Sequence, residues 1–203
     1  MRHPRILRTG SKSDTAAIGQ AVEALRRGSL IVMPTDTVYG LAADARLPDA
    51  LDKIYEAKSR ERGKPIPLLA VGVAAVEAFG ARLGAVERRL AVRFWPGPLT
   101  LVLGVGERTE GFRVPDHGVA LALLGANGGP LRVTSANVSG EPPALTAEAA
   151  ACTVGVSVEL ILDAGPSPGG TPSTVAEVVN GEVRILRAGA IARELLEQAC
   201  RSE

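Results

Sequence analysis

Histidine and cysteine are scarce in this sequence of 203 residues, which contains two of each. The cysteines, Cys152 and Cys200, are far apart and have no C-x-x-C spacing, and the histidines are His3 and His117. A zinc site, a disulfide framework and a Cys-His dyad are therefore poorly supported. Any chemistry must rest on other side chains.

Aromatic residues and net charge are low, and long apolar runs are absent. Aromatic residues make up 3% of the chain, and the formal net charge is +1. Binding of a polyanion by charge alone is therefore not expected, and any contact with nucleic acid would have to be local. No segment reaches membrane-spanning length, and the basic first ten residues lack the apolar run of a signal peptide. We expect a cytoplasmic protein with no membrane contact.

Apolar periodicity and turn signals divide the chain into alternating helices and strands, followed by a β-hairpin. Asp14 or Ser13 can cap the first helix. Helices are expected over 15–27, 48–58, 73–79, 86–94, 119–124, 146–151 and 191–199. Strands are expected over 30–33, 67–71, 99–103, 131–134, 160–162, 175–179 and 183–187. This order predicts a single α/β domain over residues 1–203, built on an open, twisted, mixed β-sheet flanked by helices.

A basic cluster at residues 58–64 follows the second predicted helix directly, with four cations in seven positions. Lys58 ends a helix face that it shares with Leu51, Ile54 and Tyr55. Cations at a helix C-terminus also suit the helix dipole, which is the alternative explanation. The density of charge beside an apolar strand favours an anion-binding site.

Two polar loops, residues 34–41 and 135–140, follow predicted strands. Open α/β sheets bind ligands beyond the C-terminal ends of their strands, so both loops are candidates; side chains that close local turns are the alternative. The segment around Ser135 lacks the first glycine of the G-x-S-x-G motif, and no histidine pattern supports a hydrolase triad. We interpret Ser135 as a hydrogen-bonding group and His117 as a structural turn residue.

The segment 165–174 is rich in Gly, Pro, Ser and Thr but contains no Gly-Lys-Ser/Thr. A Walker-type P-loop is therefore not supported. An active-site lid or a linker are the two remaining explanations, and residues 165–172 are our candidate for a segment that closes over a bound nucleotide.

Eight short motifs, taken together and in order, resemble the YrdC/TsaC family of threonylcarbamoyl-adenylate synthases. They are PTDTVYGL (34–41), KSR (58–60), KP (64–65), WPGPLT (95–100), RVPDH (113–117), TSANVSG (134–140), STV (173–175) and ILRAG (185–189). Each is modest alone, but the ordered set is specific and covers about residues 16–191.

The resemblance implies an enzyme that condenses L-threonine, bicarbonate and ATP into threonylcarbamoyl-adenylate and pyrophosphate. Partner proteins then pass the threonylcarbamoyl group to the adenosine beside the anticodon in tRNAs that read codons beginning with A. Weak direct binding of tRNA would also fit this role. The family fold has a large basic concave face, and Mg²⁺ on the ATP phosphates is expected, although no acidic pair in the sequence identifies a metal site.

The family's site residues can be placed on matching positions of this chain. By resemblance, L-threonine is bound by Thr37, Arg113, Ser135 and Ser173, and ATP by Arg60, Lys64, Thr109, Asn137 and Arg187. Lys58 and Arg60 are the family's Lys-x-Arg pair and the predicted catalytic residues, with Lys58 expected to steady the bicarbonate or carbamate oxygens.

Three departures from the family pattern and two alternative functions remain. Leu69 stands where many longer relatives have a histidine near the threonine, and Glu110-Gly111-Phe112 replaces the usual small apolar residues, which affects the role of Thr109. We also expect a protein of the short type, without the additional C-terminal domain of the longer relatives. The alternatives are an RNA-binding module for tRNA or double-stranded RNA, and a related carbamoyl-adenylate enzyme with a different acceptor.

Overall fold

Eleven strands form one mixed sheet in the part of the chain that the computed structural model describes, residues 4–10 and 14–201. The strands are β1 Arg5–Arg8, β2 Ile31–Met33, β3 Gly40–Asp44, β4 Leu68–Leu69, β5 Ala81–Arg82, β6 Leu99–Val105, β7 Arg108–Arg113, β8 Leu131–Ser135, β9 Leu160–Asp163, β10 Thr174–Val179 and β11 Glu182–Arg187. The helices are α1 Thr15–Arg26, α2 Pro48–Ala57, α3 Val73–Ala78, α4 Ala85–Phe94, α5 Gly118–Asn127, α6 Ala147–Val154 and α7 Arg193–Arg201, with a 3₁₀ turn at Gly155–Ser157. The predicted α/β class with a mixed sheet is confirmed.

The strand order in space is β1-β9-β2-β3-β8-β4-β7-β6-β10-β11, with β5 paired to β6 outside this path. Four neighbouring pairs are parallel, namely β1 with β9, β9 with β2, β4 with β7 and β6 with β10. The other neighbours along the path are antiparallel. The sheet therefore brings together loops that are distant in sequence.

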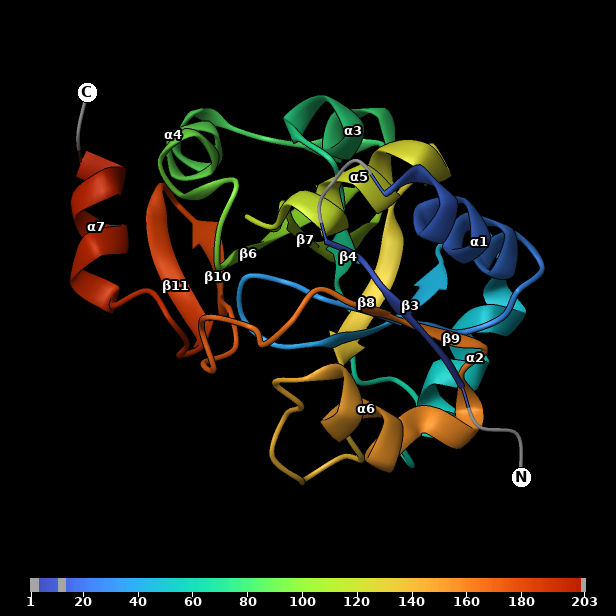
Figure 1. Ribbon diagram of the computed structural model, residues 1–203. Coiled ribbons are helices and arrows are strands. Elements are labelled where there is room, and N and C mark those ends of the chain that lie inside the picture. The colour runs from blue at the N-terminus through green and yellow to red at the C-terminus, as the bar shows by residue number, and fades with distance from the viewer. Residues whose placement is uncertain (1–3, 11–13, 202–203) are drawn as a thin grey trace.

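One half of the sheet is covered by helices on both faces (Figure 1). Successive side chains of a strand point to opposite faces. Accordingly, Ile31 and Met33 of β2 pack with α1 and α5, whereas Val32 packs in a second core with α2 and α6. Because both faces are buried, these strands read as continuous apolar runs in the sequence.

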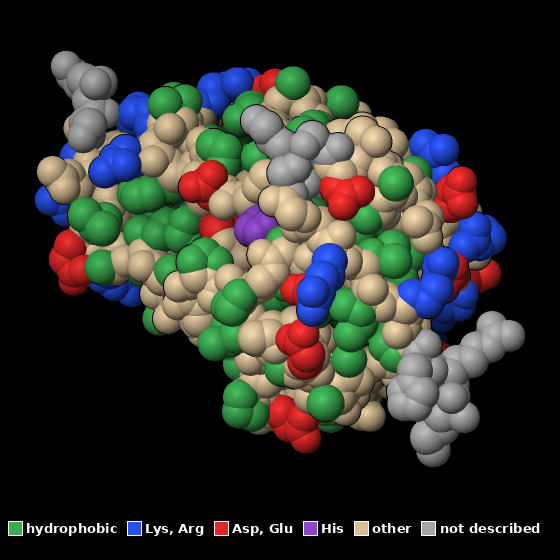
Figure 2. Space-filling view, in the orientation of Figure 1, with side chains coloured by type: hydrophobic (Ala, Val, Ile, Leu, Met, Phe, Trp, Pro, Cys, Tyr) green, Lys and Arg blue, Asp and Glu red, His purple; other side chains and the backbone are tan. Residues whose placement is uncertain are grey.

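The other half of the sheet packs against α3, α4 and α7, around Leu90, Leu101, Phe112 and Leu196. Figure 2 shows hydrophobic side chains on the surface over α4, α7 and β11. In this region Val92 is 83% exposed. No helix within residues 4–10 and 14–201 is both long and apolar enough to cross a membrane.

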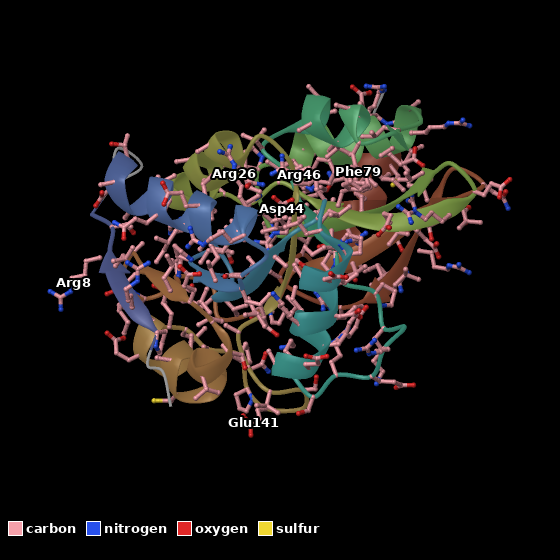
Figure 3. All side chains as sticks on the ribbon, turned by 90° about the vertical axis from the view of Figure 1, so that its right-hand side faces the viewer. Arg8, Arg26, Asp44, Arg46, Phe79 and Glu141 are labelled. Atoms are coloured by element: carbon pink, nitrogen blue, oxygen red, sulfur yellow. The ribbon has the colours of Figure 1, made fainter. Side chains whose placement is uncertain are left out.

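Two ion pairs connect strands of the sheet to neighbouring segments. Arg46 donates to the buried Asp44 carboxylate from Nε at 2.9 Å and from Nη2 at 2.5 Å (Figure 3). Arg132 of β8 donates to Glu110 of β7 across the short strand β4, at 2.6 and 2.8 Å. Hydrogen bonds from Arg132 hold the pKa of Glu110 below its usual range, although burial opposes this. The unusual acidic residue at position 110 therefore has a structural partner.

The seven predicted helices are all present, with ends shifted by a few residues. Asp14 is the N-cap of α1 and accepts a hydrogen bond from the Ala17 amide at 3.3 Å, while Ser13 lies outside the described residues. The strand predicted over 67–71 is shorter, because only Leu68 and Leu69 pair with neighbours. The sequence did not predict β1, β3, β5 and β7. In the structure β1 pairs with β9, β3 with β2 and β8, β5 with β6, and β7 with β4 and β6.

Replacing Gly19 with alanine should stabilise the protein. Gly19 lies in the exposed part of α1, and an added Cβ would meet nothing within 4 Å. Alanine in a helix interior is favoured over glycine by about 0.5–1 kcal/mol. We expect urea unfolding to give a gain of that size for Gly19→Ala. Gly28→Ala should instead destabilise, because Gly28 has φ +75°.

Candidate active site

Two adjoining cavities contain most of the predicted site residues. The hydroxyl cavity, about 160 Å³, is lined by the four predicted threonine ligands together with Thr35 and Thr100. The cationic cavity, about 380 Å³, is lined by Lys58, Lys64 and Asn137. Arg60 and Ser135 line both cavities, so the two cavities adjoin, and we treat them as one candidate site.

A larger hollow of about 470 Å³ lies elsewhere, between α4 and α7. It is lined by Arg88, Arg89, Arg93 and apolar residues such as Val92 and Leu195. It contains none of the predicted site residues and no hydroxyl or carboxylate side chain, so size alone does not make it the candidate active site.

Strand pairing explains why the two polar loops meet. The loop 34–39 leads into β3, and the segment 135–140 begins at the last residue of β8. Strands β3 and β8 pair with each other, with Gly40 opposite Ser135. A Cβ on Gly40 would lie 2.5 Å from Val133 Cγ1, so glycine permits this close approach. The loop 34–39 is closed by Thr35, whose Oγ1 donates to the Val38 carbonyl at 2.6 Å and accepts from the Thr37 amide at 3.2 Å.

Arg113, at the end of β7, joins three segments in the hydroxyl cavity. Its Nε donates to the Gly97 carbonyl at 3.0 Å, its Nη1 to Thr37 Oγ1 at 2.9 Å, and its Nη2 to Asp36. The side chain is 7% exposed, and burial lowers the pKa of Arg113 while Asp36 opposes that shift. These bonds use three of the five N–H groups of the guanidinium, which leaves one on each terminal nitrogen for a ligand carboxylate.

Lys58 reaches from the end of α2 to the loop after β8. Its Nζ donates to the carbonyl oxygens of Ser135 and Asn137, each at 2.5 Å, and to Asn137 Oδ1 at 2.9 Å. Burial and the nearby Arg60 guanidinium lower the pKa of Lys58 to about 8. An ammonium group has three N–H donors, and these contacts occupy all of them. Lys58 therefore fixes the loop that carries Ser135 and Asn137.

The remaining cations of the basic cluster are in different environments. Lys64 pairs with Glu61 at 3.1 Å, and Arg62 pairs with Asp52 at 3.1 Å. Arg60 has no carboxylate partner among the described residues; its Nη2 donates to the Pro65 carbonyl at 3.3 Å, and its buried Nε has no hydrogen-bond partner there. Arg60 is thus the cluster member best placed to receive an anion.

Ser173 and Arg187 meet at the start of β10. Arg187 Nη2 donates to the Ser173 carbonyl at 2.8 Å and to Ser173 Oγ at 3.2 Å. Ser173 Oγ also lies 2.8 Å from Thr100 Oγ1, and both side chains are buried. The contact between Arg187 and Ser173 joins a predicted ATP ligand to a predicted threonine ligand.

Thr109 is the one predicted site residue outside both cavities. It is exposed on β7, opposite Gly104 of β6. Leu69, the departure from the family pattern, lines the hydroxyl cavity and is buried. The role of Thr109 stays a prediction.

Thr100 and Asp36 are the neighbours of the site to which the sequence assigned no role. Both lie within motifs that carried the resemblance, in WPGPLT and PTDTVYGL. Their contacts with Ser173 and Arg113 depend on residues 73 and 77 positions away, so no local pattern identified them.

The predicted lid segment, residues 165–172, is docked on the loop 34–39. The Gly170 amide donates to the Thr37 carbonyl at 2.8 Å, and Ser167 Oγ donates to the Thr35 carbonyl at 3.2 Å. The buried hydroxyl of Tyr39 donates to the Gly165 carbonyl at 2.7 Å, and burial raises the pKa of Tyr39 to about 12. The segment therefore supports Thr37 from behind; closure over ATP stays a prediction.

Replacing Gly169 with alanine should weaken binding of the amino acid substrate. A Cβ at this position would lie 2.6 Å from the Asp36 carbonyl oxygen, so the loop that carries Thr37 must move. We expect the KM for that substrate to rise on the order of tenfold, because small misplacements of binding groups are costly. Thr171→Ala, an exposed change in the same segment, should leave the KM unchanged. Equal values for both variants would contradict the supporting role.

No group of three or more His, Cys, Asp or Glu side chains that could hold a metal ion occurs within residues 4–10 and 14–201. Asp36, which lies between the cavity-lining residues Thr35 and Thr37, is paired with Arg113. The described residues therefore do not fit a protein-held metal site.

Comparison with known proteins gives consistent matches along almost the whole chain. A sequence profile described as Sua5_yciO_yrdC, telomere recombination, matches residues 23–189. A putative threonylcarbamoyl-AMP synthase of Mycobacterium tuberculosis is 38% identical, covering 89% of this chain and 88% of the relative. Threonylcarbamoyl-AMP synthase of Bacillus subtilis is 37% identical over 89% of this chain, which spans 55% of that protein.

A solved structure also matches closely. The crystal structure of Pyrococcus abyssi Sua5 complexed with L-threonine has a TM-score of 0.90 and 32% identity. It covers 96% of this chain, which spans 60% of that protein. Some relatives are thus considerably longer than this chain, whereas the mycobacterial relative is of similar extent.

Proposed function

The chain belongs to the Sua5/YciO/YrdC family, and we propose that it acts as an L-threonylcarbamoyladenylate synthase. The reaction condenses L-threonine, bicarbonate and ATP to threonylcarbamoyl-AMP and pyrophosphate. The observation that carries this proposal is the junction of the two cavities at Arg60 and Ser135. A hydroxyl-lined cavity suited to an amino acid adjoins there a cationic cavity suited to a polyphosphate.

L-Threonine would occupy the hydroxyl cavity. Arg113 would hold its carboxylate through the remaining N–H of each terminal nitrogen, an arrangement suited to two parallel charge-assisted hydrogen bonds. Thr37, Ser135 and Ser173 would provide hydroxyl groups for its amine and side chain. Leu69 forms part of the apolar wall beside these groups.

The triphosphate of ATP would lie in the cationic cavity. Arg60 and Lys64 would contact the phosphates there, and Asn137 would contribute polar groups. Arg187 would contact the phosphates from the hydroxyl cavity, which it lines, and Thr109 would require a nucleotide that extends beyond both cavities. The positions of Arg60 and Lys64 on one cavity wall support this assignment. Mg²⁺ would then be carried by the phosphates and not by a carboxylate cluster of the protein.

The substrates supply the reacting groups themselves. The threonine nitrogen forms a bond to the bicarbonate carbon to give a carbamate with loss of water. A carbamate oxygen then attacks the α-phosphorus of ATP, and pyrophosphate leaves with the electron pair of the broken P–O bond. No protein nucleophile is needed, so the protein acts by orientation, which can lower a barrier by about 7–11 kcal/mol, and by stabilising charge on the pyrophosphate.

Lys58 has a different place in this proposal from the one expected from the sequence. Its three N–H groups are donated to Ser135 and Asn137, so direct contact with bicarbonate would require the loss of one bond. We assign Lys58 to holding the loop that carries Ser135 and Asn137, and Arg60 to the developing charge.

Pyrophosphate release from ATP tests the function. Release should require both L-threonine and bicarbonate and should be lost in the Lys58→Ala, Arg60→Ala double variant. Arg93→Ala, an exposed change on α4 outside both cavities, serves as the control for loss of a cation. Release without threonine, or none from the folded protein under all conditions, would contradict the proposal.

Several further expectations belong to the same proposal. Residues 1–203 would work as one domain, in the cytoplasm, and partner proteins would carry the activated group to tRNA. No observation favours an RNA-binding module over the synthase. The cations available for direct tRNA contact are reduced, because Arg62 and Lys64 are paired with carboxylates.

A further inference from the structure

A buried carboxylate stands beside the guanidinium that is proposed to hold the threonine carboxylate. Asp36 Oδ1 accepts a hydrogen bond from Arg113 Nη2, and the two side chains are 12% and 7% exposed. Thr35 and Thr37, the neighbours of Asp36, line the hydroxyl cavity, and Asp36 lies behind Arg113. A substrate carboxylate would therefore approach a cation whose charge is already balanced.

The pairing of Arg113 with Asp36 determines which ligands bind more tightly because of Arg113. A lone carboxylate adds a second negative charge beside Asp36, and like charges at short range in a buried site repel strongly. An amino acid brings its own ammonium group and so offsets that charge. Arg60 and Arg187 also line the hydroxyl cavity, and both are proposed phosphate contacts, so bound ATP would balance their charge.

We propose that Asp36 is a specificity-determining residue, which acts through Arg113 to make the hydroxyl cavity select an amino acid over a simple carboxylic acid. The inference rests on the proposed function, because it takes the threonine carboxylate to bind Arg113. Asp36 is a positioning residue in this scheme, since its established contact is with Arg113 and not with the ligand. Because of Asp36, a ligand would bind tightly only if its amine and hydroxyl groups made contacts in addition to those of its carboxylate.

A purely structural role for Asp36 is the alternative. In that case Asp36 would hold Arg113 in place, and its loss would weaken all ligands of the cavity equally. The Nε bond to Gly97 and the Nη1 bond to Thr37 hold the guanidinium independently of Asp36. Asparagine at position 36 can still accept from Nη2 through its amide oxygen, so Asp36→Asn removes the charge and keeps the shape.

The test compares two ligands that differ only in the amine. (R)-3-Hydroxybutyrate has the carboxylate, hydroxyl and methyl group of L-threonine but no nitrogen. Calorimetric titration should give the wild-type protein a preference of at least about 100-fold for L-threonine. In Asp36→Asn this preference should fall at least about tenfold, mainly through tighter binding of hydroxybutyrate. Asp36→Glu, which retains the charge, should keep most of the preference.

Controls separate this inference from the function itself. Glu107→Gln removes an exposed negative charge from the β6–β7 turn and should leave the preference unchanged. An unchanged preference in folded Asp36→Asn, with normal pyrophosphate release in the wild type, would overturn the inference alone. Wild-type binding of both ligands within tenfold would overturn it even if Asp36→Asn did not fold. No threonine binding to the wild type would overturn the proposed function as well.

Discussion

Replacing Lys58 with methionine should lower the turnover of pyrophosphate release by about 10²–10³-fold. Methionine matches the length of the buried stem but cannot donate to the Ser135 carbonyl, the Asn137 carbonyl and Asn137 Oδ1. The loop after β8 would then lose the group that fixes it. A misplacement of about 1 Å at a substrate-binding site can cost about 10²-fold in rate, and this loop loses three bonds at once. Initial-rate measurements at saturating ATP, threonine and bicarbonate give the result.

The matched control is Lys53→Met, on the same helix. Lys53 Nζ donates a single bond to the Gly28 carbonyl at 2.6 Å and lines neither site cavity. Its loss should leave turnover close to that of the wild type. Turnover of Lys58→Met within threefold of the wild type would contradict the role assigned to Lys58.

The lowered pKa of Lys58 also predicts that turnover depends on pH. Because the pKa of Lys58 is lowered to about 8, wild-type turnover should fall as the pH rises through that value. The neutral amine has two N–H donors for three acceptor oxygens, so one bond to the loop is lost. Below the pKa the ammonium form predominates and all three bonds are made. The low residual turnover of Lys58→Met should lack this decline.

The sequence predicted the helices well because each contains its own signals. In α1, Asp14 as N-cap, a periodic apolar face and Gly28 at the end are all local. Some strands could not be predicted in this way. Arg5–Arg8 has two arginines in four residues and becomes a strand only because β9, about 155 positions later, offers its edge.

The sequence indicated which residues line the candidate site, but not which atoms those residues contact. The sequence brought Thr37, Arg113, Ser135 and Ser173 together through a resemblance, and the structure places all four around one cavity. It did not indicate that the donors of Lys58 are occupied within the protein. Nor did it indicate that Asp36 faces Arg113, since partners 77 or 79 residues apart are set by the sheet order.

Replacing Arg113 with lysine should raise the KM for L-threonine by about 30- to 5000-fold. The guanidinium serves Gly97, Thr37 and Asp36 while it keeps one N–H on each terminal nitrogen. A lysine ammonium has three N–H groups on one atom, so it cannot hold these acceptors and a carboxylate at once. Loss of a buried, hydrogen-bonded charge contact commonly costs about 2–5 kcal/mol. Initial rates at varied threonine concentration give the KM, and the KM for ATP should change less than threefold.

Arg132→Lys is the control, because Arg132 is also buried in the sheet and paired bidentately with a carboxylate, Glu110. It lines neither site cavity, so its replacement should lower the melting temperature and leave the threonine KM unchanged. The pair of variants separates damage to the sheet from damage to the site. An unchanged threonine KM in Arg113→Lys would place the substrate carboxylate elsewhere, and Arg187, beside Ser173, would be the next residue to replace.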